Sequence, residues 1–185
     1  MVQPTDLNSL RSQLAAALPE GWSLRDEACN DSDVTFLAAL YSSTREDELA
    51  VVPWPQTQKD AFVHQQFLLQ RQHYRQHYAG AGFWIVERGQ TPVGRIYVFR
   101  SPSELRLMDV ALLPASQRQG IGAALLRALL RQASRSGNAV TLHVEPNNPV
   151  NRLYQRLGFR FVTDRGAYHF LRWSPDAAGA DDCLS

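Results

Sequence analysis

The chain has 185 residues, of which 44% are hydrophobic and 20% charged, and its formal net charge is +1. This size and composition are typical of a globular domain with a sizeable core, and they exclude an intrinsically disordered chain. The balanced charge argues against a surface built for nucleic acid, and no apolar stretch approaches the roughly 20 residues of a membrane span.

The first half of the sequence is predicted to be mainly helical. Residues 1–21 form an N-terminal helical extension, in which Thr5 can cap an amphipathic helix that ends at residues 19–21. A strand over 22–28 follows. Two helices come next, the first beginning at the capping residues 30–33 and the second spanning 56–78; the expected apolar positions are Val34, Leu37, Leu40, Tyr41, Phe62, Phe67 and Leu68.

Strands dominate from residue 83 onward. The expected strands cover residues 83–87, 92–100, 104–113, 140–145, 159–163 and 167–173, with helices over 120–136 and 149–157. This order predicts an α+β fold with a mixed, mainly antiparallel central sheet, flanking helices and one central β-α-β crossover. We expect one domain over 22–174 and a mobile tail over 175–185.

The turn from Gln117 to Ala123 is the most informative segment, because it joins a strand to a strongly amphipathic helix. Gly120 and Gly122 let the backbone approach a ligand closely, and the helix N-terminus favours an anion. A diphosphate fits this description, and Arg118 can add a charge-assisted hydrogen bond.

Two other nucleotide-binding turns do not fit this segment. A Walker A loop needs Lys followed by Ser or Thr after its last glycine, where this chain has Ala123 and Ala124. A dinucleotide-binding fingerprint needs a third glycine, and Leu125 stands there instead. A plain tight turn before a core helix remains the alternative.

Two motifs in order resemble the Gcn5-related N-acetyltransferase (GNAT) superfamily. Residues 117–123 match its (Arg/Gln)-x-x-Gly-x-(Gly/Ala) signature, and residues 148–159, with Leu153-Tyr154 and Gly158-Phe159, resemble its second hallmark. The resemblance spans about residues 22–173. It implies transfer of an acetyl group from acetyl-CoA to a primary amine by direct attack on the thioester. The alternative is a non-catalytic acyl-CoA-binding module, since Arg106 stands where some relatives carry a glutamate base.

The resemblance also assigns residues to the cosubstrate. A bulged strand is expected to pair its backbone with the pantetheine arm and to leave a slot for the thioester, while the turn holds the diphosphate. Tyr154 is the expected general acid; the alternative is a core tyrosine. The implied CoA-binding residues are Val110, Ala111, Leu112, Gln117, Arg118, Gln119, Gly120, Ile121, Gly122, Ala123, Asn147, Asn148 and Tyr154.

The general base is less well defined by the sequence. Asp109 is a candidate, although the neighbouring bulge leaves open which face it occupies; His143, Glu145 and a route through water are alternatives. Asn148 before Pro149 suits a helix N-cap.

The acceptor is expected to be a small-molecule or peptide amine. By analogy with the fold, its site involves Tyr41, Arg45, Glu48 and Trp54, where acids beside aromatic rings can attract a cation; an ordinary charged loop is the alternative. His73 and His77 share a helix face without metal-ligand partners, and Cys29 and Cys183 have no metal spacing. With a polar N-terminus, we expect a cytoplasmic monomer or homodimer without metal, nucleic-acid or membrane partners.

Overall fold

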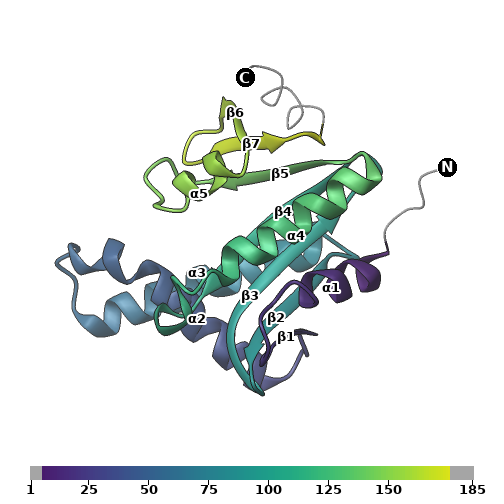
Figure 1. Ribbon diagram of the computed structural model, residues 1–185. Helices are drawn as coiled ribbons and strands as arrows, with labels where there is room; N and C mark the ends of the chain where they lie inside the picture. Colours follow the sequence, from purple (N-terminus) through teal and green to yellow (C-terminus); the bar gives the residue numbers. More distant parts are fainter. Residues whose placement is uncertain (1–5, 176–185) are drawn as a thin grey trace.

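The computed structural model describes residues 6–175, so Thr5 and the predicted tail beyond residue 175 lie outside the described part of the chain. Figure 1 shows the elements. In chain order they are α1 (Leu7–Ala15), β1 (Trp22–Asp26), α2 (Asp31–Ala50), α3 (Gln56–His77), β2 (Gly82–Arg88), β3 (Thr91–Arg100), β4 (Glu104–Leu112), the 3-10 turn η1 (Pro114–Ser116), α4 (Ile121–Ser136), β5 (Ala139–Val144), α5 (Asn151–Arg156), β6 (Arg160–Asp164) and β7 (His169–Trp173).

The strands form a seven-stranded sheet in the order β1-β2-β3-β4-β5-β7-β6. Every neighbouring pair is antiparallel except β4 and β5, which run parallel and are joined by the crossover through α4. The predicted α+β class with one central crossover is therefore confirmed. Among the helices of the described residues, none is long and apolar enough to cross a membrane.

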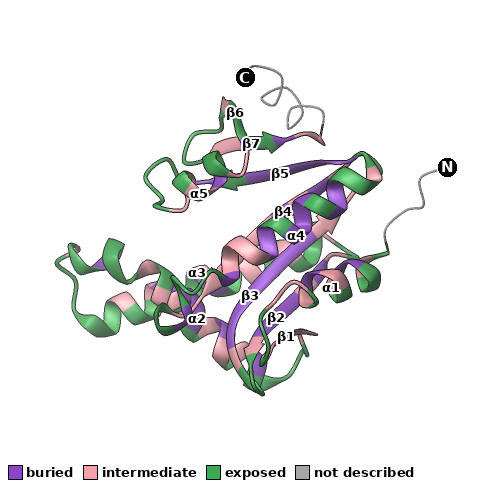
Figure 2. Cartoon of the chain, in the orientation of Figure 1, coloured by how far each residue is buried: buried purple, intermediate pink, exposed green. Residues whose placement is uncertain are grey.

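Two hydrophobic cores cover the two faces of the sheet. The larger core packs α1 and α4 against the strands, and the smaller one packs α2 and α3 against the opposite face. Figure 2 shows the buried residues concentrated on the central strands and on the inner side of α4. Leu10 and Leu14 are completely buried beside Leu125 and Leu129, so α1 is packed into the larger core.

The structure corrects three local predictions. Leu68 is 45% exposed, and Val63 takes its expected place because Val63 and Phe67, one helical turn apart, share the buried face of α3. Helix α5 begins at Asn151, so Asn148 is not its N-cap; its side-chain oxygen instead accepts from Val150 N–H at 3.0 Å in the preceding turn. The N-cap residue of α1 is Asp6 rather than the expected Thr5, and the Asp6 side chain makes no capping hydrogen bond.

We expect Leu14→Ala to lower the free energy of unfolding by about 3 kcal/mol, because the substitution leaves a cavity between α1 and the sheet. Urea denaturation monitored by circular dichroism measures this loss. Leu69→Ala, at a position that is 52% exposed on α3, is the matched control and should change stability by less than about 0.5 kcal/mol. Equal losses in the two variants would contradict the burial of α1.

Candidate active site

A bulge in β4 divides the sheet. Tyr97 of β3 lies opposite Asp109, but the next residue, Val98, lies opposite Leu107, so Met108 is the extra residue. The parallel pairing of β4 with β5 ends at Leu107 and Leu142. Beyond this point the two strands part, as Figure 1 shows. We call residues 108–112 of β4 and 143–144 of β5 the β4–β5 divergence. The bulge expected here is thus present.

The backbone of β4 at the divergence presents polar groups away from β3. The Leu113 N–H donates to Val93 O at 2.8 Å, so by antiparallel alternation Ala111 also pairs toward β3. The N–H and C=O groups of Val110 and Leu112 therefore point toward the β5 side. The Leu112 carbonyl accepts a hydrogen bond from the Gln117 side chain at 2.8 Å. Of the three predicted pairing residues, two thus face the divergence.

A hydrogen bond from helix α3 stabilises the bulge on the α2/α3 side of the sheet. The Tyr74 hydroxyl donates to the Met108 carbonyl at 3.2 Å. Burial raises the pKa of Tyr74 well above its usual range, so this donor stays protonated at neutral pH. Sequence reasoning missed Tyr74, since no local pattern connects residue 74 with residue 108.

The turn before α4 concentrates unpaired N–H groups. Arg118 and Gly120 adopt positive φ angles of 59° and 80°, which bend the chain sharply into the helix. The Ala124 N–H donates to Gly120 O at 2.9 Å, but among the described residues none of the N–H groups of 118–123 has a backbone acceptor. A Cβ added at Gly120 or Gly122 would meet nothing within 4 Å. The turn is therefore an open cluster of donors at a helix N-terminus, which suits an anion.

Tyr154 of α5 is a buried side chain. It is 5% exposed in the larger core, and its ring packs edge-to-face on Phe159 at 5.4 Å. Burial, and to a smaller extent the negative charge of Asp109, raise the pKa of Tyr154 well above its usual range. The phenol is therefore a persistent proton donor. The position of Tyr154 in the core also agrees with the alternative considered from the sequence, which is a purely structural core tyrosine.

The loop between β5 and α5 contains Asn147 and Asn148, both exposed. Its shape depends on a third asparagine that the sequence reasoning did not single out. The Asn151 side chain donates to the carbonyl of Glu145 at 3.0 Å and to that of Pro146 at 2.9 Å.

The bulge decides the facing of Asp109, which the sequence left open. Its carboxylate lies on the α2/α3 side, 2.5 Å from a guanidinium nitrogen of Arg95, whose side chain is 4% exposed. Arg95 also donates to the Gln70 side chain at 2.9 Å. This ion pair favours a structural role for Asp109 over that of a proton acceptor.

The two other candidate bases differ in their partners. Glu145 is 3.4 Å from Arg45, within ion-pair distance. His143 is exposed, and its ring lies 5.0 Å from the Phe170 ring. Partial burial, followed by the charges of Arg106 and Arg165, lowers the pKa of His143 below its ordinary value of 6.5. His143 is therefore neutral at pH 7 and can accept a proton.

Only part of the predicted acceptor set comes together. Tyr41 packs on Phe67 with ring centroids 6.0 Å apart, and Arg45 bridges Glu48 at 2.8 Å to Glu145 at the end of β5. Trp54 instead packs edge-to-face on Phe62 in the α2–α3 connection. Burial is the main cause that raises the pKa of Tyr41 and of Tyr74, and Tyr168 in the β6–β7 turn lies close enough to both to add to the rise. Sequence reasoning missed Tyr168.

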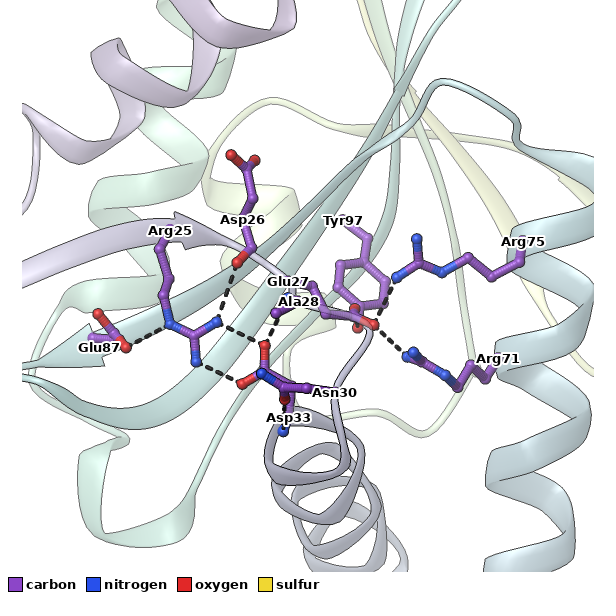
Figure 3. Close-up of polar contacts among 10 residues, drawn as sticks. All are labelled: Arg25, Asp26, Glu27, Ala28, Asn30, Asp33, Arg71, Arg75, Glu87 and Tyr97. Carbon is purple, nitrogen blue, oxygen red and sulfur yellow. Dashed lines mark hydrogen bonds and ion pairs between the residues drawn. The ribbon is translucent and has the colours of Figure 1, made fainter.

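A buried polar network lies under the α2/α3 side of the sheet (Figure 3). The Glu27 side chain is completely buried and accepts from the Tyr97 hydroxyl at 2.6 Å, from Arg75 at 2.7 Å and from Arg71. Burial alone would raise the pKa of Glu27, but the hydrogen bonds from Tyr97 and Arg71 and the two positive charges lower it below its usual value. Tyr97 is the register partner of Asp109, so the network adjoins the bulge.

A second carboxylate extends this network toward β1. Arg25 holds Asp33 through two hydrogen bonds of 2.7 and 2.6 Å and donates to Glu87 at 2.7 Å. The Ala28 N–H also donates to Asp33 at 2.7 Å. These contacts fix the chain between β1 and α2.

Residues 37–159 match the family model described as the acetyltransferase (GNAT) family. A search of curated proteins found no match.

Solved structures share the fold at low identity. An N-acetyltransferase (PaiA) from Thermoplasma acidophilum in complex with coenzyme A is 17% identical with a TM-score of 0.62; the alignment covers 83% of this chain and 98% of that one. An acetyltransferase from Streptococcus agalactiae is 16% identical, with a TM-score of 0.59 and coverage of 84% and 99%. Arabidopsis thaliana Naa50, in complex with a bisubstrate analogue, is 19% identical, with a TM-score of 0.53 and coverage of 83% and 99%.

We expect Glu27→Gln to reduce the free energy of unfolding at pH 7 by about 3 kcal/mol, because Arg71 and Arg75 lose their buried counter-charge. The folded-state pKa of Glu27 lies below its ordinary value of 4.5, so this stabilisation is present above pH 4.5 and is lost as the pH falls further.

Urea denaturation of both proteins at pH 7 and at acidic pH tests this expectation. The difference between wild type and variant should shrink at acidic pH, where the wild-type carboxylate also becomes protonated. Glu20→Gln, at an exposed position, is the control and should have little effect. A difference that is constant with pH would show that the charge of Glu27 does not contribute.

Proposed function

Because this chain belongs to the acetyltransferase (GNAT) family, we propose that it transfers an acetyl group from acetyl-CoA to a primary amine. The open cluster of N–H donors at the start of α4, beside the unpaired backbone of β4, supports this proposal most directly. Acetyl-CoA supplies a diphosphate, an extended amide-containing arm and an activated acetyl thioester. The diphosphate suits the donors of residues 118–123, where glycines leave room for close approach.

The extended arm requires backbone partners, which the β4–β5 divergence offers. On the β5 side, no strand among the described residues pairs with the N–H and C=O groups of Val110 or with the N–H group of Leu112. The Leu112 carbonyl is engaged by Gln117, so Gln117 must release it before that oxygen can accept from a ligand. Asn147 and Asn148 lie in the adjoining loop and are available for further polar contacts.

In the proposed reaction, the amine nitrogen forms a bond to the acetyl carbon, and the bond from that carbon to sulfur breaks. His143 takes one proton from the amine, directly or through water, because it is neutral at pH 7 and lies at the start of the divergence. Tyr154 donates a hydrogen bond to the departing sulfur. A phenol with a raised pKa holds its own proton strongly, which favours stabilisation of the thiolate by hydrogen bonding over complete transfer.

The activity itself is tested by release of CoA thiol from acetyl-CoA in the presence of polyamines, amino acids, aminoglycosides and peptides with free N-termini. Thiol release that depends on one of these amines supports the proposal. Binding of acetyl-CoA without turnover of any amine would instead identify a non-catalytic acyl-CoA-binding module.

We expect Gly120→Glu to weaken CoA binding by about a hundredfold, because the new carboxylate would oppose the diphosphate at the helix N-terminus. Isothermal titration calorimetry with CoA measures the change. Gly89→Glu is the matched control: Gly89 has a similar positive φ of 60° and open surroundings, but it lies in the β2–β3 turn. Similar losses in both variants would reject the assignment of the turn.

We expect Tyr154→Phe to lower kcat by about a hundredfold, because the variant cannot donate a hydrogen bond to the leaving sulfur. The KM for acetyl-CoA should change by less than about threefold, since the aromatic packing on Phe159 is kept. Steady-state thiol release measures both constants. An unchanged kcat would return Tyr154 to a purely structural role.

A further inference from the structure

We propose that the acceptor is an amino acid, whose carboxylate binds to an anion subsite formed by Arg106, His143 and Arg165. The inference rests on the proposed function, because it names the class of amine that the same site acetylates. The three side chains come from β4, from β5 and from the β6–β7 turn.

Arg106 and His143 lie on the same side of the sheet. Leu142 and Val144 are buried in the larger core, so the alternate residues Thr141 and His143 face the α2/α3 side. Arg106 is the register partner of Thr141 on the neighbouring strand and faces the same side, where its guanidinium is 3.3 Å from the Tyr78 hydroxyl of α3. His143 is thus two residues beyond the partner of Arg106.

Arg165 lies near His143 because both side chains pack on the ring of Phe170. Phe170 is the register partner of His143, and their ring centroids are 5.0 Å apart. The guanidinium of Arg165 lies 5.7 Å from the centroid of the Phe170 ring. A hydrogen bond of 2.8 Å from Arg165 N–H to Tyr168 O closes the turn that carries it. The ring of Phe170 is therefore shared by an imidazole and a guanidinium.

On the α2/α3 side of the sheet, some arginine side chains pair with carboxylates of the described residues and Arg165 does not. Arg95 pairs with Asp109, and Arg45 pairs with Glu48 and Glu145. Within residues 6–175, by contrast, no carboxylate lies within ion-pair distance of Arg165.

Arg106 has spare hydrogen-bonding capacity. Its terminal nitrogen is 3.1 Å from Glu104, but its Nε is buried without an acceptor in the described part of the chain. The adjacent Thr141 hydroxyl is likewise buried without a hydrogen-bond partner there. Because the buried Nε–H of Arg106 has no acceptor among the described residues, Glu104 alone does not satisfy this guanidinium, and a carboxylate that reaches its terminal nitrogens would add to that pairing. A carboxylate matches the planar donor pattern of guanidinium groups.

The position of this subsite limits the distance between carboxylate and amine. His143 is the first residue of β5 beyond the paired segment, and it is also the proposed proton acceptor. A carboxylate held by Arg165 and Arg106 beside His143 must therefore be close to the amine that reacts. In an α-amino acid a single carbon separates the two groups. A polyamine, in contrast, would bring additional positive charge to the same two guanidinium groups.

The test compares L-alanine and L-phenylalanine with their α-amides as acceptors, using thiol release by wild type and by Arg165→Gln. The amides have less basic amines, so each acceptor is compared between wild type and variant. We expect Arg165→Gln to raise the KM for the amino acids by about tenfold and to change kcat/KM for the amides by less than about twofold. Arg165→Lys should restore part of the loss, since it keeps the charge. Arg131→Gln, on the exposed side of α4, is the matched control.

A binding measurement gives a readout that does not depend on turnover. With CoA present, N-acetyl-L-phenylalanine should bind wild type about tenfold more tightly than its amide does, and Arg165→Gln should remove this preference. If acetyl-CoA binds but no amine is acetylated, the proposed function fails. Amines without a carboxylate, polyamines or peptides could be acetylated while Arg165→Gln leaves the KM for the amino acids unchanged. In that case the anion subsite is wrong and the acetyltransferase proposal stands.

Discussion

The bulge at Met108 is the constraint on which the site depends. A seven-stranded sheet normally satisfies the backbone groups of its central strands through both neighbours, and an unpaired central strand is costly. Here the pairing of β4 and β5 ends at Leu107 and Leu142, near the middle of the sheet. The protein offsets part of this cost with side chains: Tyr74 donates to the bulge carbonyl, and Gln117 donates to Leu112 O. What remains unpaired is backbone that a ligand can use.

The same bulge makes the two sides of the sheet chemically different. On the side of α1 and α4 the strands present mainly aliphatic residues, including Leu105, Leu107 and Val110. Because one extra residue reverses the alternation, Asp109 turns to the other side, where it meets Arg95 and adjoins the Glu27 network. One side therefore supplies rigidity through close packing, and the other supplies fixed charges and hydroxyl groups close to the proposed reaction centre.

Sequence reasoning worked where the signal was local. The stripe of leucines in α4 and the glycines at 120 and 122 are short-range patterns, and together with the strand spacing they were enough to predict the fold class. It was wrong where tertiary contacts decide. The choice between Val63 and Leu68 depends on which face of a weakly amphipathic α3 meets the sheet. Glu27, Arg71 and Tyr97 are far apart along the chain, so no motif announces that they converge on one buried carboxylate.

The burial of α1 has a consequence for how the chain folds during synthesis. Leu10 and Leu14 leave the ribosome before the α4 residues of the same core, which are translated about a hundred residues later. At 5–20 residues per second, several seconds pass before that surface exists. Helix α1 is thus made well before the α4 surface that completes its burial, and its leucines remain accessible to chaperones throughout that interval.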